Sequence, residues 1–311
     1  MADGSGHPEI ASAPWALWGH SGGAYWSLRM ACLFPDRTVA VVARSNGLKE
    51  HAAELPTSVP VIFIYGVREK EEFKGIVDSI NETFPASRAR GALAAMAVDP
   101  ESSHDCRHSR LLAIPYLDAC LSMRLGPDGL RNVDPASGVF TGTAGGDVRE
   151  YDPQLQDDES MSWLPDARVA KALAEYVSTG RVTDTTPPDH APTELAAHAN
   201  GDGSVEPTWK ARADVDSGIK TFNVYRDGEL LGSYAGDAAY HDGAFQSGNY
   251  GDDPLPDALY QSNSDYTWEP PAMRFVDRGL TPGETYSYAV STVNWSDLES
   301  ARSAPLTYAH A

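Results

Sequence analysis

The chain has 311 residues, enough for about two domains of ~150 residues each and for a buried core that needs no disulfide staples. Hydrophobic residues make up 41% of the chain and charged residues 22%, and 44 acidic against 24 basic residues give a formal net charge of −20. That charge would repel a phosphate backbone, and no run of 18 or more apolar residues is present, so the sequence argues against nucleic-acid binding and against a membrane-spanning helix.

Residues 1–125 alternate between continuous apolar runs and amphipathic stretches. Phe73, Val77 and Ile80, for example, fall four and three residues apart, which is the spacing of one helix face. Because the strands are continuously apolar, they are expected to be buried on both faces, as in a parallel sheet covered by helices. The predicted strands span 14–18, 38–43, 59–65 and 92–98, and the predicted helices span 22–34, 71–83 and 111–121.

Residues 126–189 are weakly patterned and rich in glycine and aspartate, so we interpret them as an irregular connector. One helix is expected in this connector, over 165–177, with Pro165 suited to its first turn. The proline-rich run 185–192 reads as a stiff, extended linker and marks the domain boundary.

Beyond the linker, the apolar residues change to a period of two. Residues 219–225 alternate, and Asp227-Gly228 is a two-residue hairpin signal between two such runs. Several short strands with turn signals between them predict an antiparallel, immunoglobulin-like sandwich over residues 190–309.

The three cysteines, Cys32, Cys106 and Cys120, form no C-x-x-C motif, which excludes a zinc knuckle and a thioredoxin motif. Their odd number leaves at least one thiol free. We expect buried free thiols, with a Cys106–Cys120 disulfide as the alternative.

The segment Gly19-His20-Ser21-Gly22-Gly23 fits the pattern G-x-S-x-G at the end of a predicted strand and the start of a predicted helix. This setting is that of a nucleophile elbow, in which glycines allow a strained turn that holds the serine oxygen near the positive end of the helix. The alternative is a plain glycine-rich turn between a strand and a helix.

A nucleophilic serine needs a base, and the base needs a group that orients it. Glu69 follows the third predicted strand and His104 follows the fourth, so Ser21, the acid and the histidine occur in the order Ser, acid, His, each just after a separate strand. Rival acids lie further into the next helix, at Glu71, Glu72 and Asp78.

Ser21, Glu69 and His104 together resemble the triad of the α/β-hydrolase superfamily, and residues 104–120 are similar to the terminal helix of its esterase and polyester-depolymerase-like members. The resemblance covers residues 10–125. It implies a fold class of α/β type, a partial α/β-hydrolase whose parallel sheet holds strands like the fifth to eighth, followed by the all-β sandwich.

The resemblance also implies a role for each site residue. Ser21 is the nucleophile, His104 the general base and then acid, Glu69 the orienter of the imidazole, and the Gly22 N–H the oxyanion donor. His20 is interpreted as a neighbour of the elbow, and His108 as a residue that faces solvent or caps the helix. Neither a metal nor an organic cofactor is implied.

The chain also departs from the family pattern. The family elbow follows a fifth strand, whereas here it falls at residue 21, and no His-Gly pair exists for the loop that supplies a second oxyanion donor. Loss of one such donor typically costs ~2.7–4 kcal/mol of transition-state stabilisation. We therefore expect an N-terminally incomplete hydrolase with weak or no activity alone; the alternative is a remodelled, inactive relative.

Residues 279–294 resemble the sixth strand of a fibronectin type III domain, with Tyr286 at the tyrosine-corner position. Trp209 resembles the core tryptophan of that domain, and residues 218–228 its third strand and hairpin. The resemblance covers residues 190–309 and implies the fold, but says little of function.

The excursion over 240–271 interrupts the sandwich. It reads either as a sugar- or polymer-binding face or as a long loop that packs its aromatics on its own sandwich; its aspartates give only a weak calcium signal. The aromatic residues are Tyr250, Tyr260, Tyr266 and Trp268.

The leading hypothesis is a serine hydrolase that acts on small-molecule or polymeric carboxylic esters through a Ser-His-Glu triad. The alternative is a non-catalytic binding or adhesion protein with a hydrolase-like scaffold. In either case the sandwich is a candidate binder of a polysaccharide or polymer surface. Residues 1–7 show no signal peptide, and an extracellular or periplasmic location is expected only by analogy.

Overall fold

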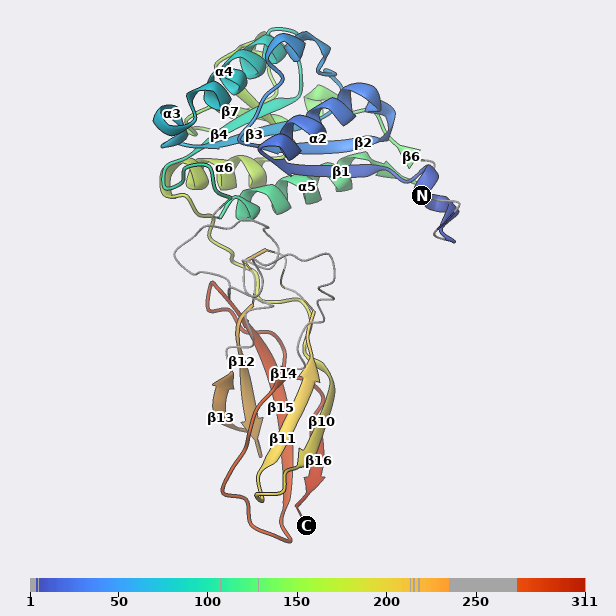
Figure 1. Ribbon diagram of the computed structural model, residues 1–311, viewed down its shortest axis with the longest axis vertical. Helices are drawn as coiled ribbons and strands as arrows, with labels where there is room; N and C mark the ends of the chain where they lie inside the picture. The colour runs from blue at the N-terminus through green and yellow to red at the C-terminus, as the bar shows by residue number, and fades with distance from the viewer. Residues whose placement is uncertain are drawn as a thin grey trace. The chain divides into compact units, whose positions relative to one another are not determined.

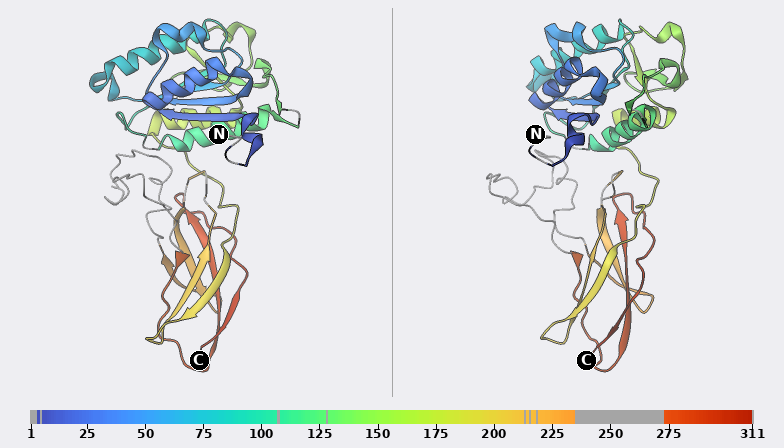
Figure 2. Two further views of the ribbon diagram at one scale, coloured as in Figure 1. Left: turned by 45° about the vertical axis from the view of Figure 1, so that its right-hand side comes forward. Right: turned by 90° about the vertical axis from the view of Figure 1, so that its right-hand side faces the viewer.

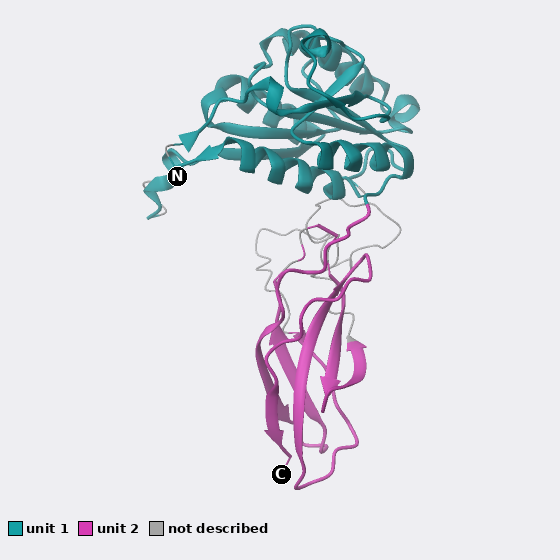
Figure 3. Cartoon of the chain, turned by 180° about the vertical axis from the view of Figure 1, so that it is seen from behind, with its two compact units in different colours: residues 1–182 teal, residues 183–311 magenta. Residues whose placement is uncertain are grey.

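The computed structural model divides into two compact units, Met1–Val182 and Thr183–Ala311 (Figures 1 and 3). Each unit has a hydrophobic core of its own. Within the described part of the chain, no helix combines the length and the apolar character that a bilayer crossing requires. The residues described are 4, 6–106, 108–127, 129–212, 214, 216–217, 219–234 and 273–310.

The first unit contains the parallel sheet that the sequence predicts. Four strands pair in the order β1-β2-β3-β4, and every pair is parallel. All residues of β2 and β3 are buried, which accounts for their continuous apolar pattern. The strands are β1 (Trp15–His20), β2 (Thr38–Arg44), β3 (Val61–Gly66) and β4 (Ala94–Asp99).

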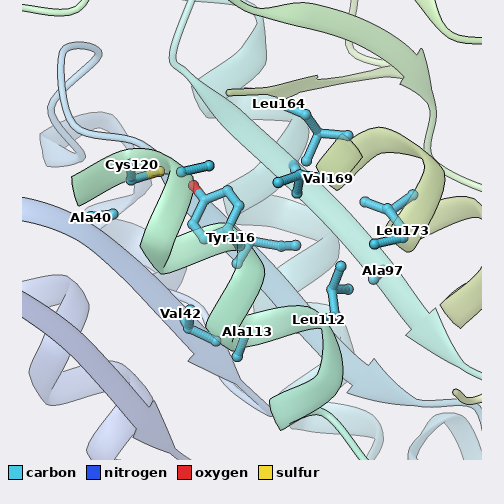
Figure 4. Packing of buried hydrophobic residues seen from close by; sticks show 14 of the residues in the cluster. Ala40, Val42, Ala97, Leu112, Ala113, Tyr116, Cys120, Leu164, Val169 and Leu173 are labelled. Atoms are coloured by element: carbon cyan, nitrogen blue, oxygen red, sulfur yellow. The ribbon is translucent and has the colours of Figure 1, made fainter. Parts of the chain in front are cut away.

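Helices cover both faces of this sheet (Figure 2). On one face, Leu28 and Phe84 pack against Phe63 of β3. On the other face, Tyr116 and Leu173 belong to the core around the opposite side of the strands (Figure 4). The first face carries α2 (Gly22–Leu33) and α4 (Lys74–Arg88), and the second carries α5 (Arg110–Arg124) and α6 (Ala167–Thr179). The short helix α3 (Glu69–Glu72) follows β3. Short 3₁₀ turns are η1 (Pro8–Ala11), η2 (Pro35–Arg37), η3 (Lys49–Glu54), η4 (Pro135–Ser137) and η5 (Pro153–Leu155).

Residues 126–182 are part of the first unit, and our interpretation of them as a connector is wrong. They form an antiparallel sheet in the order β8-β7-β9, and the Met96 N–H of β4 donates to Ser162 Oγ of β9 at 3.1 Å. Phe140 and Trp163 of this sheet are fully buried. The strands are β7 (Val139–Gly142), β8 (Arg149–Glu150) and β9 (Met161–Leu164), with a further pair, β5 (Leu125–Gly126) and β6 (Gly129–Leu130).

The expected fold class, a partial α/β-hydrolase sheet followed by a sandwich, is therefore corrected. The first unit combines a four-stranded parallel sheet with antiparallel sheets in one body. Strands of two to four residues are too short to show a period, so their burial arises from long-range packing that local pattern does not report.

Helix α6 begins two residues later than predicted, for a reason visible at its ends. The Asp166 carboxylate accepts the Val169 N–H at 2.8 Å as an N-cap, which leaves Pro165 just outside the helix. Gly180 ends the helix with φ of 70°, a left-handed conformation that favours glycine.

The second unit consists of antiparallel strands, as predicted. Trp209, Phe222 and Val290 pack in the core between its two sheets. The Tyr286 hydroxyl accepts the Thr281 N–H at 2.8 Å, which is the hydrogen bond of a tyrosine corner. One sheet has the order β10 (Thr193–Ala199), β11 (Val205–Lys210), β14 (Met273–Arg274), and the other β13 (Glu229–Tyr234), β12 (Ile219–Arg226), β15 (Thr285–Asn294), β16 (Leu306–Ala309).

All three cysteines are free, so the Cys106–Cys120 disulfide that we considered is absent. Cys106 and Cys120 are buried, whereas Cys32 is half-buried. The aromatic residues of the excursion over 240–271 lie outside the described residues.

The placement of α6 in the core of the sheet can be tested at Leu173. Leu173→Ala is expected to destabilise the first unit by about 2–5 kcal/mol because it leaves a cavity beneath the sheet. Lys171→Ala, on the exposed face of the same helix, should change stability by less than about 0.5 kcal/mol. Hydrogen exchange at the amides of β4 measures both effects, and unchanged protection in Leu173→Ala would contradict this packing.

Candidate active site

Ser21 lies in the turn between β1 and α2 and has a conformation that few non-glycine residues adopt. Its φ is 56° and its ψ −120°. The turn is held by the Ser21 N–H, which donates to the Arg44 carbonyl at 2.8 Å. A Cβ on Gly19 would lie 2.1 Å from the Gly23 carbonyl oxygen, so only glycine permits this approach of strand and helix. Ser21 thus lies in a tight strand-to-helix turn at positive φ, at the place where the sequence predicts a nucleophile elbow.

His104, which follows β4, lies between Ser21, which follows β1, and Glu69, which follows β3. Its Nε2 lies 3.0 Å from Ser21 Oγ, and its Nδ1 lies 2.5 Å from Glu69 Oε1. Since an ionised carboxylate only accepts hydrogen bonds, we assign the proton to Nδ1, which leaves Nε2 as the acceptor of the serine hydroxyl. The structure thus brings together all three residues predicted for the triad.

The Glu69 side chain is fully buried, and hydrogen bonds reach both of its carboxylate oxygens. Its second oxygen, Oε2, accepts the Gly66 N–H at 2.8 Å and the Ser45 hydroxyl at 3.0 Å. These bonds satisfy the oxygen that does not face His104, which a buried charge requires. The rival acids lie elsewhere: Glu71 is exposed, Glu72 accepts the Ser103 hydroxyl, and Asp78 pairs with Lys74.

Two aromatic rings flank the imidazole of His104. Phe73 stacks on it with centroids 4.6 Å apart, and His20 lies at the same centroid distance with a tilt of 43°. Burial, followed by repulsion from a protonated His104 and from Arg44, lowers the pKa of His20 from 6.5 to about 4. His20 is thus neutral at pH 7 and a poor base, in line with its interpretation as a neighbour of the elbow.

Two other predicted positions fall at helix starts. Gly22 is the first residue of α2 and is exposed, so its N–H belongs to the unpaired, positively polarised end of that helix. His108 lies half-buried in the turn before α5, where its carbonyl accepts the Leu111 N–H at 2.9 Å. No group of three or more His, Cys, Asp or Glu side chains within the described ranges could hold a metal ion.

Arg44 is a site residue that sequence reasoning missed. Its buried guanidinium donates to the Asp105 carbonyl from Nε at 3.1 Å and from Nη2 at 2.5 Å, and Nη2 also reaches Ser102 Oγ at 2.6 Å and the Ser103 carbonyl at 3.2 Å. All of these partners flank His104. In the sequence, Arg44 is visible only as a charged residue at the end of an apolar strand, and it belongs to no recognised motif.

No protein-family model matches the chain, and no curated protein matches it. Among solved structures, a family 28 exopolygalacturonase of Yersinia enterocolitica is 24% identical over 38% of this chain and 20% of its own, with a TM-score of 0.26. An Fn3-like protein of Clostridium thermocellum is 19% identical over 39% of this chain and 91% of its own, with a TM-score of 0.23. The spore cortex lytic enzyme SleM of Clostridium perfringens is 11% identical over 95% and 80%, with a TM-score of 0.25. Likeness this low carries no argument about this chain.

The low pKa of His20 predicts how the stability of the first unit depends on pH. The unfolded chain binds a proton at His20 near pH 6.5, whereas the folded chain does so only near pH 4, so acid favours unfolding. This contribution is complete above pH 6.5 and is lost as the pH falls toward 4. Between about pH 7.5 and 5 the loss is about 2 kcal/mol.

Urea unfolding of the wild type and of His20→Gln at the two pH values tests this expectation. The wild type should lose about 2 kcal/mol more than the variant on acidification. An equal loss of unfolding free energy in both proteins would show that the pKa of His20 is not lowered in the folded protein.

Proposed function

We propose that this protein is a serine hydrolase that acts on carboxylic esters. The observation that carries the proposal is the hydrogen-bonded line from Ser21 Oγ through His104 to the buried carboxylate of Glu69, with the serine at a strained turn. A serine hydroxyl is a weak nucleophile until an oriented base takes its proton, and this line supplies both the base and its orienting group.

The proposed reaction has two halves. Ser21 Oγ attacks the ester carbonyl while its proton passes to His104 Nε2, and Glu69 stabilises the imidazolium through Nδ1. The tetrahedral oxyanion faces the Gly22 N–H at the start of α2. Its collapse expels the alcohol, which takes the proton from Nε2. Water, deprotonated by the same nitrogen, then attacks the acyl-enzyme. Collapse of this second intermediate breaks the bond between Ser21 Oγ and the acyl carbon, Oγ takes the proton back from Nε2, and the carboxylic acid is released.

An ester suits this site better than an amide. We assign one backbone donor, the Gly22 N–H, to the oxyanion, and a single donor stabilises the tetrahedral intermediate less than a pair does. An alcohol is a better leaving group than an amine, so an ester makes the smaller demand on that stabilisation.

We propose that the second unit is a fibronectin type III-like module that binds a polysaccharide or polymer surface. The buried Trp209 and the Tyr286–Thr281 hydrogen bond support the domain assignment. By analogy with other hydrolases joined to such modules, we propose an extracellular or periplasmic setting.

Labelling with a fluorophosphonate probe tests the proposed nucleophile. The wild type should be labelled at Ser21, and Ser21→Ala should abolish both the labelling and the hydrolysis of 4-nitrophenyl butyrate, with a loss of about three orders of magnitude or more. Ser12→Ala, at an exposed serine, is the control and should be labelled like the wild type. A folded wild-type protein that is not labelled would favour the non-catalytic binding alternative.

Glu69→Gln tests the orienting acid. The amide keeps the shape of the side chain but loses its charge, so it no longer fixes the tautomer of His104, and kcat is expected to fall by about 10³–10⁴-fold. The neighbouring acid Glu71 is exposed, and Glu71→Gln should leave kcat within about twofold of the wild type. Equal effects of the two substitutions would assign the role of the acid to another residue.

A further inference from the structure

We infer that Arg44 is a positioning residue that fixes His104 relative to Ser21. The inference rests on the proposed function, because it concerns how the base of that reaction is held. Arg44 is the last residue of β2, the strand that pairs with β1 on one side and β3 on the other. It touches both halves of the site with different parts of the same residue.

Its backbone holds the nucleophile. The Arg44 carbonyl accepts the Ser21 N–H at 2.8 Å, one residue beyond the pairing of His20 with Arg44 in the parallel ladder. Its side chain holds the base. The carbonyls of Ser103 and Asp105, the residues on either side of His104, both accept hydrogen bonds from the guanidinium.

The segment that carries His104 depends on this guanidinium because it has no regular secondary structure. Residues 100–106 form neither helix nor strand and lie between β4 and the turn before α5. Without Arg44, the inward-facing carbonyl of the buried Asp105 would lose two donors, and an unsatisfied buried acceptor costs about 1–3 kcal/mol. The segment would relieve that cost by moving, and a displacement of about 1 Å at the base can cost about 10²-fold in rate.

The site requires the fork of an arginine. The Asp105 carbonyl accepts hydrogen bonds from two nitrogens of the guanidinium, Nε and Nη2, while Nη2 also reaches the Ser102 hydroxyl and the Ser103 carbonyl. A lysine ammonium on a flexible stem lacks the second nitrogen and the fixed geometry of this pair. The hydrogen-bond partners of the guanidinium given above are uncharged oxygens, so they do not neutralise its positive charge. That charge contributes to the low pKa of His20.

A buried arginine can also be purely structural, and the first unit supplies a matched control. Arg124 is equally buried and donates to the carbonyls of Thr38 and Val39, at the opposite end of β2 from Arg44. Both arginines bind backbone carbonyls, but only Arg44 touches the segment that carries His104.

The experiment compares Arg44→Lys with Arg124→Lys in the full chain, with 4-nitrophenyl butyrate as substrate. Arg44→Lys should lower kcat by about 10²-fold at nearly constant KM and slow fluorophosphonate labelling of Ser21 by the same factor. Arg124→Lys should keep kcat within about threefold, although both variants lose stability to urea. Guanidinium ion at tens of millimolar should restore activity to Arg44→Ala and not to Arg124→Ala.

Equal kcat losses in the two lysine variants, or an unchanged kcat in Arg44→Lys, would overturn the inference and leave the proposed function intact. An inactive, unlabelled wild-type protein would overturn both. If Arg44→Lys does not fold, Ser102→Ala removes one partner of the guanidinium, and a kcat equal to that of the wild type in this variant would also overturn the inference.

Discussion

Parallel pairing of four strands is the constraint on which the candidate site depends. Because β1 to β4 run in one direction, their carboxyl ends meet at one edge of the sheet, and the register aligns His20 with Arg44 and Gly66 with Asp99. Residues far apart in the sequence are thereby brought within hydrogen-bond distance. Each strand end contributes one part of the proposed site: Ser21, the Arg44 that supports it, Glu69, and the segment that carries His104.

Glu69, the proposed acid, shows how this edge of the sheet accommodates a buried carboxylate. Glu69 is removed from water, so its ionised form is favourable only if both oxygens have donors. Ser45, which follows β2 with a φ of 59°, and Gly66, which ends β3, supply donors to one oxygen. The other oxygen is left for His104. Strain at Ser21 and Ser45 is thus concentrated where two strands end, as is common at functional sites.

The sequence predicted the parallel sheet and the order Ser21, Glu69, His104, because continuous apolar strands and a glycine-rich elbow are local signals. It did not predict the antiparallel strands of residues 126–182 or the role of Arg44. Those features arise from contacts between segments far apart in the chain. Arg44 donates hydrogen bonds to residues about 60 positions later in the sequence. Trp163 is buried in a four-residue strand that is too short to show an alternating apolar pattern. Neither leaves a spacing that a single sequence reveals.

The corrected segment also bears on the site. Tyr176 of α6 is fully buried and donates to Asp99 Oδ2 at 2.7 Å, and burial raises its pKa well above the usual range, so it remains a protonated donor. Asp99 ends β4, and its other oxygen accepts the Glu101 N–H at 2.9 Å, where the chain turns toward His104. The segment that carries His104 is therefore held at both ends, by α6 through Asp99 and by β2 through Arg44. Helix α6, which the sequence pattern placed in a connector, thus helps to hold the segment that brings His104 to Ser21 and Glu69.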